Sequence, residues 1–224
     1  MSQFAADIHD VAMNRGTALY RDPQKFFALT YPTHNLRRLA RDVVYRLAGR
    51  SDKAVRQLML TYGGGKTHAM VTLYHLVHDP AHLPDLPAVH DFIAEIGFTP
   101  PRARMAVLSF DRLDPVKGVD VRSPDGEIRA FKYPWSVMAY QLLGEEGLHI
   151  LGASEEERET AAFTNVLEEL LVRSSQDGMA VLILIDEVLM WARTMAGISH
   201  EWRSRLQTFF QCLTQAVTKV PRCA

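Results

Sequence analysis

A run of three glycines followed by lysine and threonine is the segment of this chain best suited to chemistry. In Gly63-Gly64-Gly65-Lys66-Thr67, a backbone without Cβ atoms can curve around a phosphate chain and point several N–H groups at it. The ammonium group of Lys66 would serve the β- and γ-phosphates, and the Thr67 hydroxyl would bind Mg²⁺. The segment therefore predicts a P-loop that binds a nucleoside triphosphate, with ATP as the expected ligand.

The match to the complete P-loop pattern has one departure. The pattern G-x-x-x-x-G-K-[ST] requires glycine at position 60, where this chain has Leu60. Taken alone, the segment is also compatible with a flexible glycine-rich turn that happens to precede Lys-Thr. We expect Leu60 to be the last buried residue of a strand, with Gly63, Gly64 and Gly65 making the turn.

A pair of acidic residues after a long apolar run supports the P-loop interpretation. Residues 180–185 are the most strand-like run in the chain and lead directly into Asp186 and Glu187. Asp186, at the end of such a strand, can hold Mg²⁺, and Glu187 is placed to orient and deprotonate an attacking water. Asp186 is thus a candidate metal ligand and Glu187 the candidate catalytic base, which favours hydrolysis over phosphoryl transfer to a metabolite.

Other residues with suitable chemistry have simpler explanations. His75, His78 and His82 lie close together, but Pro80 separates the last of them from the other two and no cysteine accompanies them. A solvated helix end is the better interpretation of these histidines. Trp135 could stack on a nucleotide base, but core packing accounts for it better.

The predicted elements place both motifs on an α/β fold. Strands are expected over residues 55–61, 105–110 and 180–185, and a hairpin turn over residues 123–126. Strands that alternate with helices predict a mainly parallel sheet flanked by helices. We expect residues 1–54 to form an N-terminal helical extension and residues 55–224 the P-loop ATPase core. Helices are expected near residues 4–11, from Pro23, from Thr33 to Gly49, from Lys66 to Val77, from Pro87 to Ile96, from Pro134 to Leu143, from Ser154 to Ser174, and through Trp202 to Val217.

Composition and charge are those of an ordinary globular protein. The chain has 224 residues, of which 47% are hydrophobic and 23% charged, enough for one sizeable α/β domain. A net charge of −1 gives no bulk attraction to nucleic acid or to an anionic membrane. No signal peptide or membrane span is visible. The two cysteines, Cys212 and Cys223, form no disulfide framework, so the cytoplasm is the expected location.

Residues 58–68 resemble the P-loop of a large prokaryotic family of AAA-like ATPases designated DUF499. That family also lacks the leading glycine and carries a histidine after the threonine, which is His68 here. The resemblance continues through residues 135–142, residues 182–187 and the closing helix up to Val220-Pro221. It implies that His68 belongs to the nucleotide-binding segment, that ATP and Mg²⁺ are the ligands, and that DNA-modification or helicase-like proteins are partners in phage defence.

An AAA-like sheet also implies a strand order. A fourth strand, which follows the helix after the Asp-Glu motif, lies between the P-loop strand and the Asp-Glu strand. We therefore expect strands 55–61 and 180–185 to share a sheet without bonding to each other, with a strand-wide gap between them. The chain stops at Ala224, soon after its last helix. The sensor residue, the fifth strand and the helical lid are therefore expected to be missing, which leaves the core truncated at its C-terminal end.

The expected function is ATP binding and hydrolysis by a subunit of a DNA-associated complex. Two alternatives stay open. One is a nucleotide-dependent switch that controls assembly, with an oligomer as the assembled form and little turnover. The other is a truncated ATPase fragment that binds nucleotide weakly and is inactive by itself. Glu187 favours hydrolysis over the switch, while the position of the last residue favours the fragment.

Overall fold

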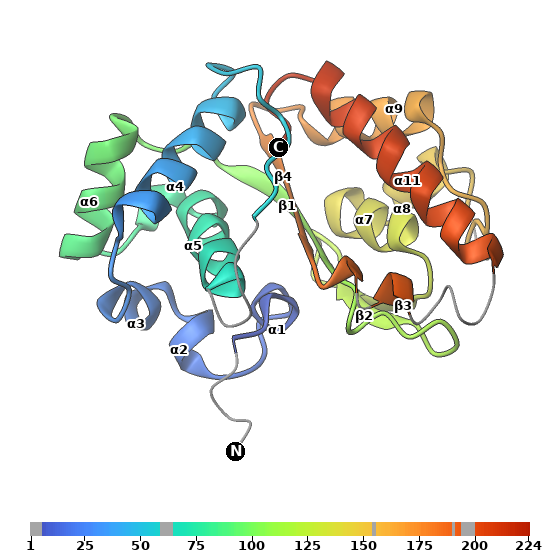
Figure 1. The fold of residues 1–224 in the computed structure, drawn as a ribbon, viewed down its shortest axis with the longest axis horizontal. Helices are drawn as coiled ribbons and strands as arrows, with labels where there is room; N and C mark the ends of the chain where they lie inside the picture. The colour runs from blue at the N-terminus through green and yellow to red at the C-terminus, as the bar shows by residue number, and fades with distance from the viewer. Residues whose placement is uncertain (1–5, 59–64, 154–155, 190, 194–199) are drawn as a thin grey trace.

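The fold is mixed α/β, with mostly helices and a small parallel sheet. The computed structural model describes residues 6–58, 65–153, 156–189, 191–193 and 200–224. Strand β1 (Ala103–Ser109) pairs in parallel with β4 (Ala180–Asp186). Strands β2 (Val119–Arg122) and β3 (Ile128–Phe131) form a separate antiparallel hairpin. The β1–β4 pair runs through the middle of the molecule, between two groups of helices (Figure 1).

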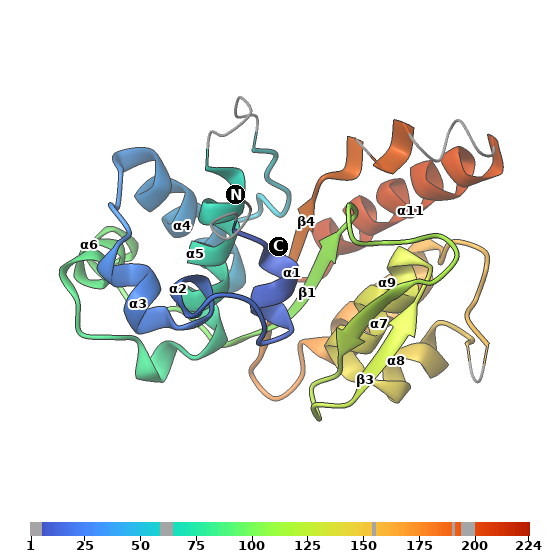
Figure 2. The ribbon, with the colours of Figure 1, turned by 90° about the horizontal axis from the view of Figure 1, so that it is seen from below.

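The two groups of helices differ in their place along the chain. The first group comes almost entirely before β1, and the second follows the hairpin and continues past β4 (Figures 1 and 2). The first comprises α1 (Ile8–Ala12), α2 (Ala18–Arg21), α3 (Pro23–Ala28), α4 (His34–Leu47), α5 (Lys66–His78), a 3₁₀ turn (Pro80–His82) and α6 (Pro87–Ile96). The second comprises α7 (Pro134–Leu143), α8 (Glu145–Ile150), α9 (Thr164–Ser174) and α11 (His200–Lys219).

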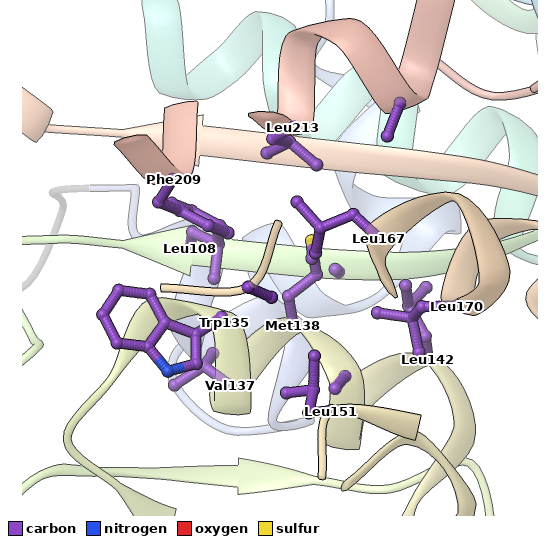
Figure 3. Packing of buried hydrophobic residues seen from close by; sticks show 14 of the residues in the cluster. Leu108, Trp135, Val137, Met138, Leu142, Leu151, Leu167, Leu170, Phe209 and Leu213 are labelled. Carbon is purple, nitrogen blue, oxygen red and sulfur yellow. The ribbon is translucent and has the colours of Figure 1, made fainter. Parts of the chain in front are cut away.

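Side chains of the two strands alternate between two hydrophobic cores. Val107 of β1 and Leu182 of β4 belong to the core formed with the first group of helices. Leu108 of β1 belongs to the core formed with the second group, shown in Figure 3. There the rings of Trp135 and Phe209 have centroids 5.8 Å apart. Burial on both faces explains why the strands read as continuous apolar runs.

Local signals predicted several elements closely. Helices α6 and α7 have the expected bounds, and Gly97 follows α6 in a left-handed conformation with φ 83°. The Asp22 carboxylate accepts the Gln24 N–H at 2.9 Å, which caps α3. The Thr33 hydroxyl accepts the Leu36 N–H at 3.3 Å and caps α4 in the same way. These caps satisfy N–H groups that a helix leaves without an internal partner.

The helix expected over residues 154–174 is shorter than predicted. It begins at Thr164, the described residues before that point are irregular, and residues 154 and 155 lie outside the described part of the chain. The Glu157 carboxylate accepts two backbone N–H groups, that of Lys132 at 2.8 Å and that of Tyr133 at 3.2 Å. The Glu157 carboxylate therefore bonds the backbone that precedes a different helix, α7, instead of starting a helix of its own.

The strand expected over residues 55–61 is absent up to Leu58, and its remaining residues, including Leu60, lie outside the described residues. The Arg56 guanidinium donates to the carbonyl of Lys53 at 2.7 Å. Strand structure needs a neighbour that accepts and donates the ladder hydrogen bonds. Within the described part of the chain these residues have no such neighbour, and they do not pair with β4.

The edge of β4 opposite β1 is occupied by the last residues of the chain. The Val181 N–H donates to the Arg222 carbonyl at 3.0 Å, and the Ile183 N–H donates to the Ala224 carbonyl at 2.8 Å. Val181 and Cys223 form a parallel bridge. A strand-wide gap was expected between β4 and the strand of residues 55–61, with no strand pairing assigned to the segment after α11. Instead it bonds to β4 on the side where the fourth strand of an AAA-like sheet was expected.

The helices before residue 54 share a core with the helices that follow. Phe26 of α3 and Val44 of α4 pack in the same cluster as Leu73 of α5 and Phe92 of α6. The division between an N-terminal extension and a core at residue 54 stays a prediction, and hydrophobic contacts cross it.

Arg46 of α4 joins distant parts of this arrangement. The residue is only 5% exposed, and its guanidinium donates to the carbonyls of Val217, Val220 and Cys223 at 2.8, 2.9 and 2.9 Å. It also donates to the Ser51 carbonyl at 3.2 Å. The last carbonyls of α11 have no partner inside the helix, and a cation at a helix C-terminus is favourable. Arg46 thus holds α4, the end of α11 and the segment on β4 together.

Replacing Arg46 should destabilise the protein strongly. We expect Arg46→Ala to lower the free energy of unfolding by about 3 kcal/mol, because several buried carbonyls lose a charged donor. Arg38→Ala removes an exposed arginine from the same helix. It should change the free energy of unfolding by less than about 0.5 kcal/mol. Urea denaturation of both variants measures the difference. Equal stabilities would show that Arg46 does not hold the segments together.

Candidate functional site

Helix α5 begins at Lys66, as the sequence predicted. Its N-cap is Gly65, with φ 85° and no side-chain capping bond. The left-handed conformation favours glycine, and the first N–H groups of the helix are left without an internal acceptor. Such an end attracts anions, phosphate among them. Gly63 and Gly64 lie outside the described residues.

The structure brings Thr67 and Asp186 together, although 119 residues separate them in sequence. The Thr67 hydroxyl, in the first turn of α5, donates to one oxygen of the Asp186 carboxylate at 3.3 Å. The other oxygen of Asp186 accepts the backbone N–H of Glu187 at 3.0 Å. Both carboxylate oxygens are therefore oriented by the protein, at the point where β4 ends beside the start of α5.

Glu187 has an unusual backbone conformation. Its φ is 56°, in the left-handed region that residues other than glycine seldom adopt. The side chain is half-buried, directly after Asp186. Further along the chain, the Trp191 indole N–H donates to the Leu113 carbonyl at 2.7 Å, which fixes the segment that follows. Strained residues of this kind are concentrated at functional sites, so the observation agrees with a functional constraint at Glu187.

His68 contacts the N-terminal helices. Its Nε2 lies 3.3 Å from the Thr30 hydroxyl oxygen, and its ring centroid lies 4.7 Å from that of Phe26. The Thr30 hydroxyl gives its own proton to the Phe26 carbonyl at 2.8 Å, so we assign the shared hydrogen to Nε2. Burial lowers the pKa of His68, which favours its neutral form. These contacts hold the first turn of α5 against α3, and a nucleotide contact by His68 stays a prediction.

Negative charge gathers where β1 and β4 end. Burial raises the pKa of the Asp111 carboxyl, and the negative charges of Asp7 and Asp186 raise it further, while Arg112 opposes them. Arg112 also forms an ion pair with Asp7. The carboxylates of Asp111 and Asp186 therefore lie close enough to interact electrostatically at this end of the sheet.

The three histidines expected at a solvated helix end lie in two environments, since His75 is only 5% exposed while His78 and His82 are exposed. His75 Nε2 lies 2.7 Å from the Tyr20 carbonyl, and His82 Nδ1 lies 3.0 Å from the Asp79 carboxylate. Within the described ranges, no group of three or more His, Cys, Asp or Glu side chains is placed to hold a metal ion. Magnesium does not need such a group, since it keeps several waters and binds through one or two protein oxygens plus phosphates. Thr67 and Asp186 fit that mode.

The structure brings together three of the four residues that motif spacing singled out, and their functional roles stay predictions. Lys66, Thr67, Asp186 and Glu187 were identified from motif spacing, and the last three lie together. The contact of His68 with Thr30 and Phe26 was missed, because no local pattern links α3 to α5.

Comparisons with known proteins place the chain in a family. Comparison with curated proteins and with solved structures gives no match. In the parts of the chain that are described, no helix has the length and apolar character to cross a membrane. A family model described as the DUF499 N-terminal domain matches residues 1–224, from the first residue of the chain to the last. The chain therefore belongs to the DUF499 family, of which it carries the N-terminal domain.

Proposed function

We propose that this protein binds ATP with Mg²⁺ and hydrolyses it, as a P-loop ATPase of the AAA-like kind. The observation that carries the proposal is the hydrogen bond between the Thr67 hydroxyl and the Asp186 carboxylate. In a P-loop ATPase these two groups share one magnesium ion, so they must meet although they lie far apart in sequence. A glycine-rich turn without this function has no need to place a threonine hydroxyl on a strand-end carboxylate.

In this proposal the first turn of α5 binds the phosphates, and Thr67 together with Asp186 at the end of β4 binds the metal ion. The first turn of α5 offers backbone N–H groups and the Lys66 ammonium to the phosphates, and Gly65 provides the turn into the helix. Thr67 and Asp186 would hold the metal, which when bound neutralises phosphate charge. The Glu187 N–H keeps the Asp186 carboxylate in its orientation. Glycines 63 and 64 complete the loop in this proposal.

Glu187 is the proposed base for hydrolysis. The oxygen of a water attacks the γ-phosphorus, and the bond from that phosphorus to the β–γ bridging oxygen breaks. The water proton passes to the Glu187 carboxylate, and ADP and phosphate leave. Glu187 is suited to this step because it follows Asp186 directly and has a constrained backbone.

The arrangement of strands supports the same fold. β1 lies on one edge of β4, and residues 222–224 bond to the other edge. An AAA-like sheet has its second strand and its fourth strand on those two sides of the Asp-Glu strand. The segment that leads to the P-loop would then lie beyond the fourth strand, although its described residues, up to Leu58, form no ladder with it.

A nucleotide-dependent switch is the second candidate function. The contact of His68 with Phe26 and Thr30 favours it, since it links the first turn of α5 to the N-terminal helices. Binding of phosphate at that turn would then bias the helices, with oligomer assembly as the output. The family resemblance adds DNA-modification or helicase-like partners and a cytoplasmic location to the proposal.

Removing the Lys66 ammonium tests phosphate binding. We expect Lys66→Ala to weaken ATP binding by about 100-fold or more, because the β- and γ-phosphates lose the ammonium charge at the first residue of α5. Lys25→Ala removes an exposed ammonium from α3 and should leave the affinity unchanged. Calorimetric titration with ATP and Mg²⁺ measures both. An ATP affinity unchanged by Lys66→Ala would rule out the P-loop interpretation.

Removing the proposed base separates hydrolysis from binding. Glu187→Gln should keep ATP affinity within about twofold and reduce turnover by roughly 100-fold or more, since the amide has a similar shape but takes no proton. Glu127→Gln changes an exposed residue of the hairpin turn and serves as the control. Phosphate release and ATP binding are measured on the same preparations. Full turnover in Glu187→Gln would assign the base to another group.

A further inference from the structure

A buried hydroxyl without a partner lies at the end of β1. Ser109 is only 7% exposed, and the part of the chain that the structure describes offers no hydrogen-bond partner to its Oγ. Burying an unpaired hydroxyl costs stability, because the bonds it made with water are lost. Most buried polar groups in proteins are paired, so an exception calls for an explanation, and functional sites are one.

The position of Ser109 relates it to the candidate site. In the parallel register of β1 and β4, Ser109 is the partner of Asp186. Side chains of a strand alternate between faces, and Val107 and Leu184, two residues before each of them, belong to the core on the α5 side of the sheet. Neighbouring strands lie about 4.8 Å apart. The Ser109 hydroxyl and the Asp186 carboxylate therefore project side by side toward α5.

A structural water is the competing explanation for the hydroxyl. A cavity of about 10 Å³ lies against Ser109, with His9 on its wall. That volume is about the size of one water, which needs two to four polar partners. The rest of the wall is largely apolar and includes Val107, Leu113 and Val119. The cavity is therefore a poor site for a bound water, while the Asp186 side of Ser109 is polar and charged.

We propose that the Ser109 hydroxyl binds a water molecule of the hydrated magnesium ion held by Thr67 and Asp186. This inference rests on the proposed function. Magnesium keeps several of its waters when it binds a protein, and those waters need acceptors around the ion. A hydroxyl one strand away from the metal-binding carboxylate supplies one. Ser109 is thus a positioning residue, which fixes the ion through its water shell.

The experiment compares two buried serines. Ser109→Ala and Ser136→Ala each remove a buried hydroxyl without a described partner, and Ser136 lies in α7, on the other face of the sheet. Ser109→Thr keeps a hydroxyl at the first position. For each variant, binding of a fluorescent ATP analogue is followed by polarisation as Mg²⁺ is raised, and thermal unfolding is recorded without nucleotide.

We expect both alanine variants to be at least as stable as the unsubstituted protein. Only Ser109→Ala should raise the Mg²⁺ concentration for half-maximal binding, by about five- to tenfold, and Ser109→Thr should restore it. Two results overturn the inference: an unchanged Mg²⁺ requirement in Ser109→Ala, or a lower thermal stability of that variant with no change in its Mg²⁺ requirement. Either result would mean that the Ser109 hydroxyl binds a structural water in the cavity. Failure of the unsubstituted protein to bind Mg²⁺ and ATP overturns the proposed function as well.

Discussion

The guanidinium of Arg46 lies where segments from both ends of the chain meet, and it donates to the carbonyls of each. Buried arginines are usually paired with a carboxylate, but among the residues that the structure describes Arg46 bonds carbonyls at and after the end of α11 instead. Because the same group bonds Ser51 and Cys223, it fixes the segment that leads toward the glycine loop relative to the segment that bonds β4. Arg46 therefore ties Ser51, at the start of that segment, to the residues that bond the edge of β4.

The candidate site is then held between two anchored elements. β4 is bonded on one edge by β1 and on the other by residues 222–224, so the place of its last residue, Asp186, is set by the sheet. Helix α5 is held by the contacts of His68 and His75 with the N-terminal helices. These contacts place the first turn of α5 beside the end of β4, where Thr67 meets Asp186. Sites of this kind work through preorganisation, since donors are in place before the ligand arrives.

Sequence predicted the elements whose signals are local. Helices α6 and α7 could be bounded from Pro87, Gly97 and Pro134, because proline and glycine act on the backbone next to them. The strands 103–109 and 180–186 were visible as apolar runs, since both faces of each are buried. The proximity of Thr67 to Asp186 was expected because both motifs were predicted to bind one Mg²⁺ ion, and the structure shows the proximity.

What could not be predicted depends on partners far away in sequence. The acidic run near Glu157 looks like a helix start, yet its carboxylate bonds the backbone before α7. Residues 55–58 have strand-like composition but no strand beside them in the described chain. The place of Ser109 beside Asp186 depends on the register of β1 and β4, which no local pattern encodes. Tertiary contacts decided each of these cases.

The most direct test of the account is a double-mutant cycle between Thr67 and Asp186, measured as ATP affinity with and without Mg²⁺. If the two groups hold one ion, Thr67→Val and Asp186→Asn should each weaken Mg²⁺-dependent binding by about tenfold or more. The double variant should then lose little beyond the larger single effect, and without Mg²⁺ all forms should bind alike. Effects that simply add, or that are the same with and without Mg²⁺, would contradict a shared metal site.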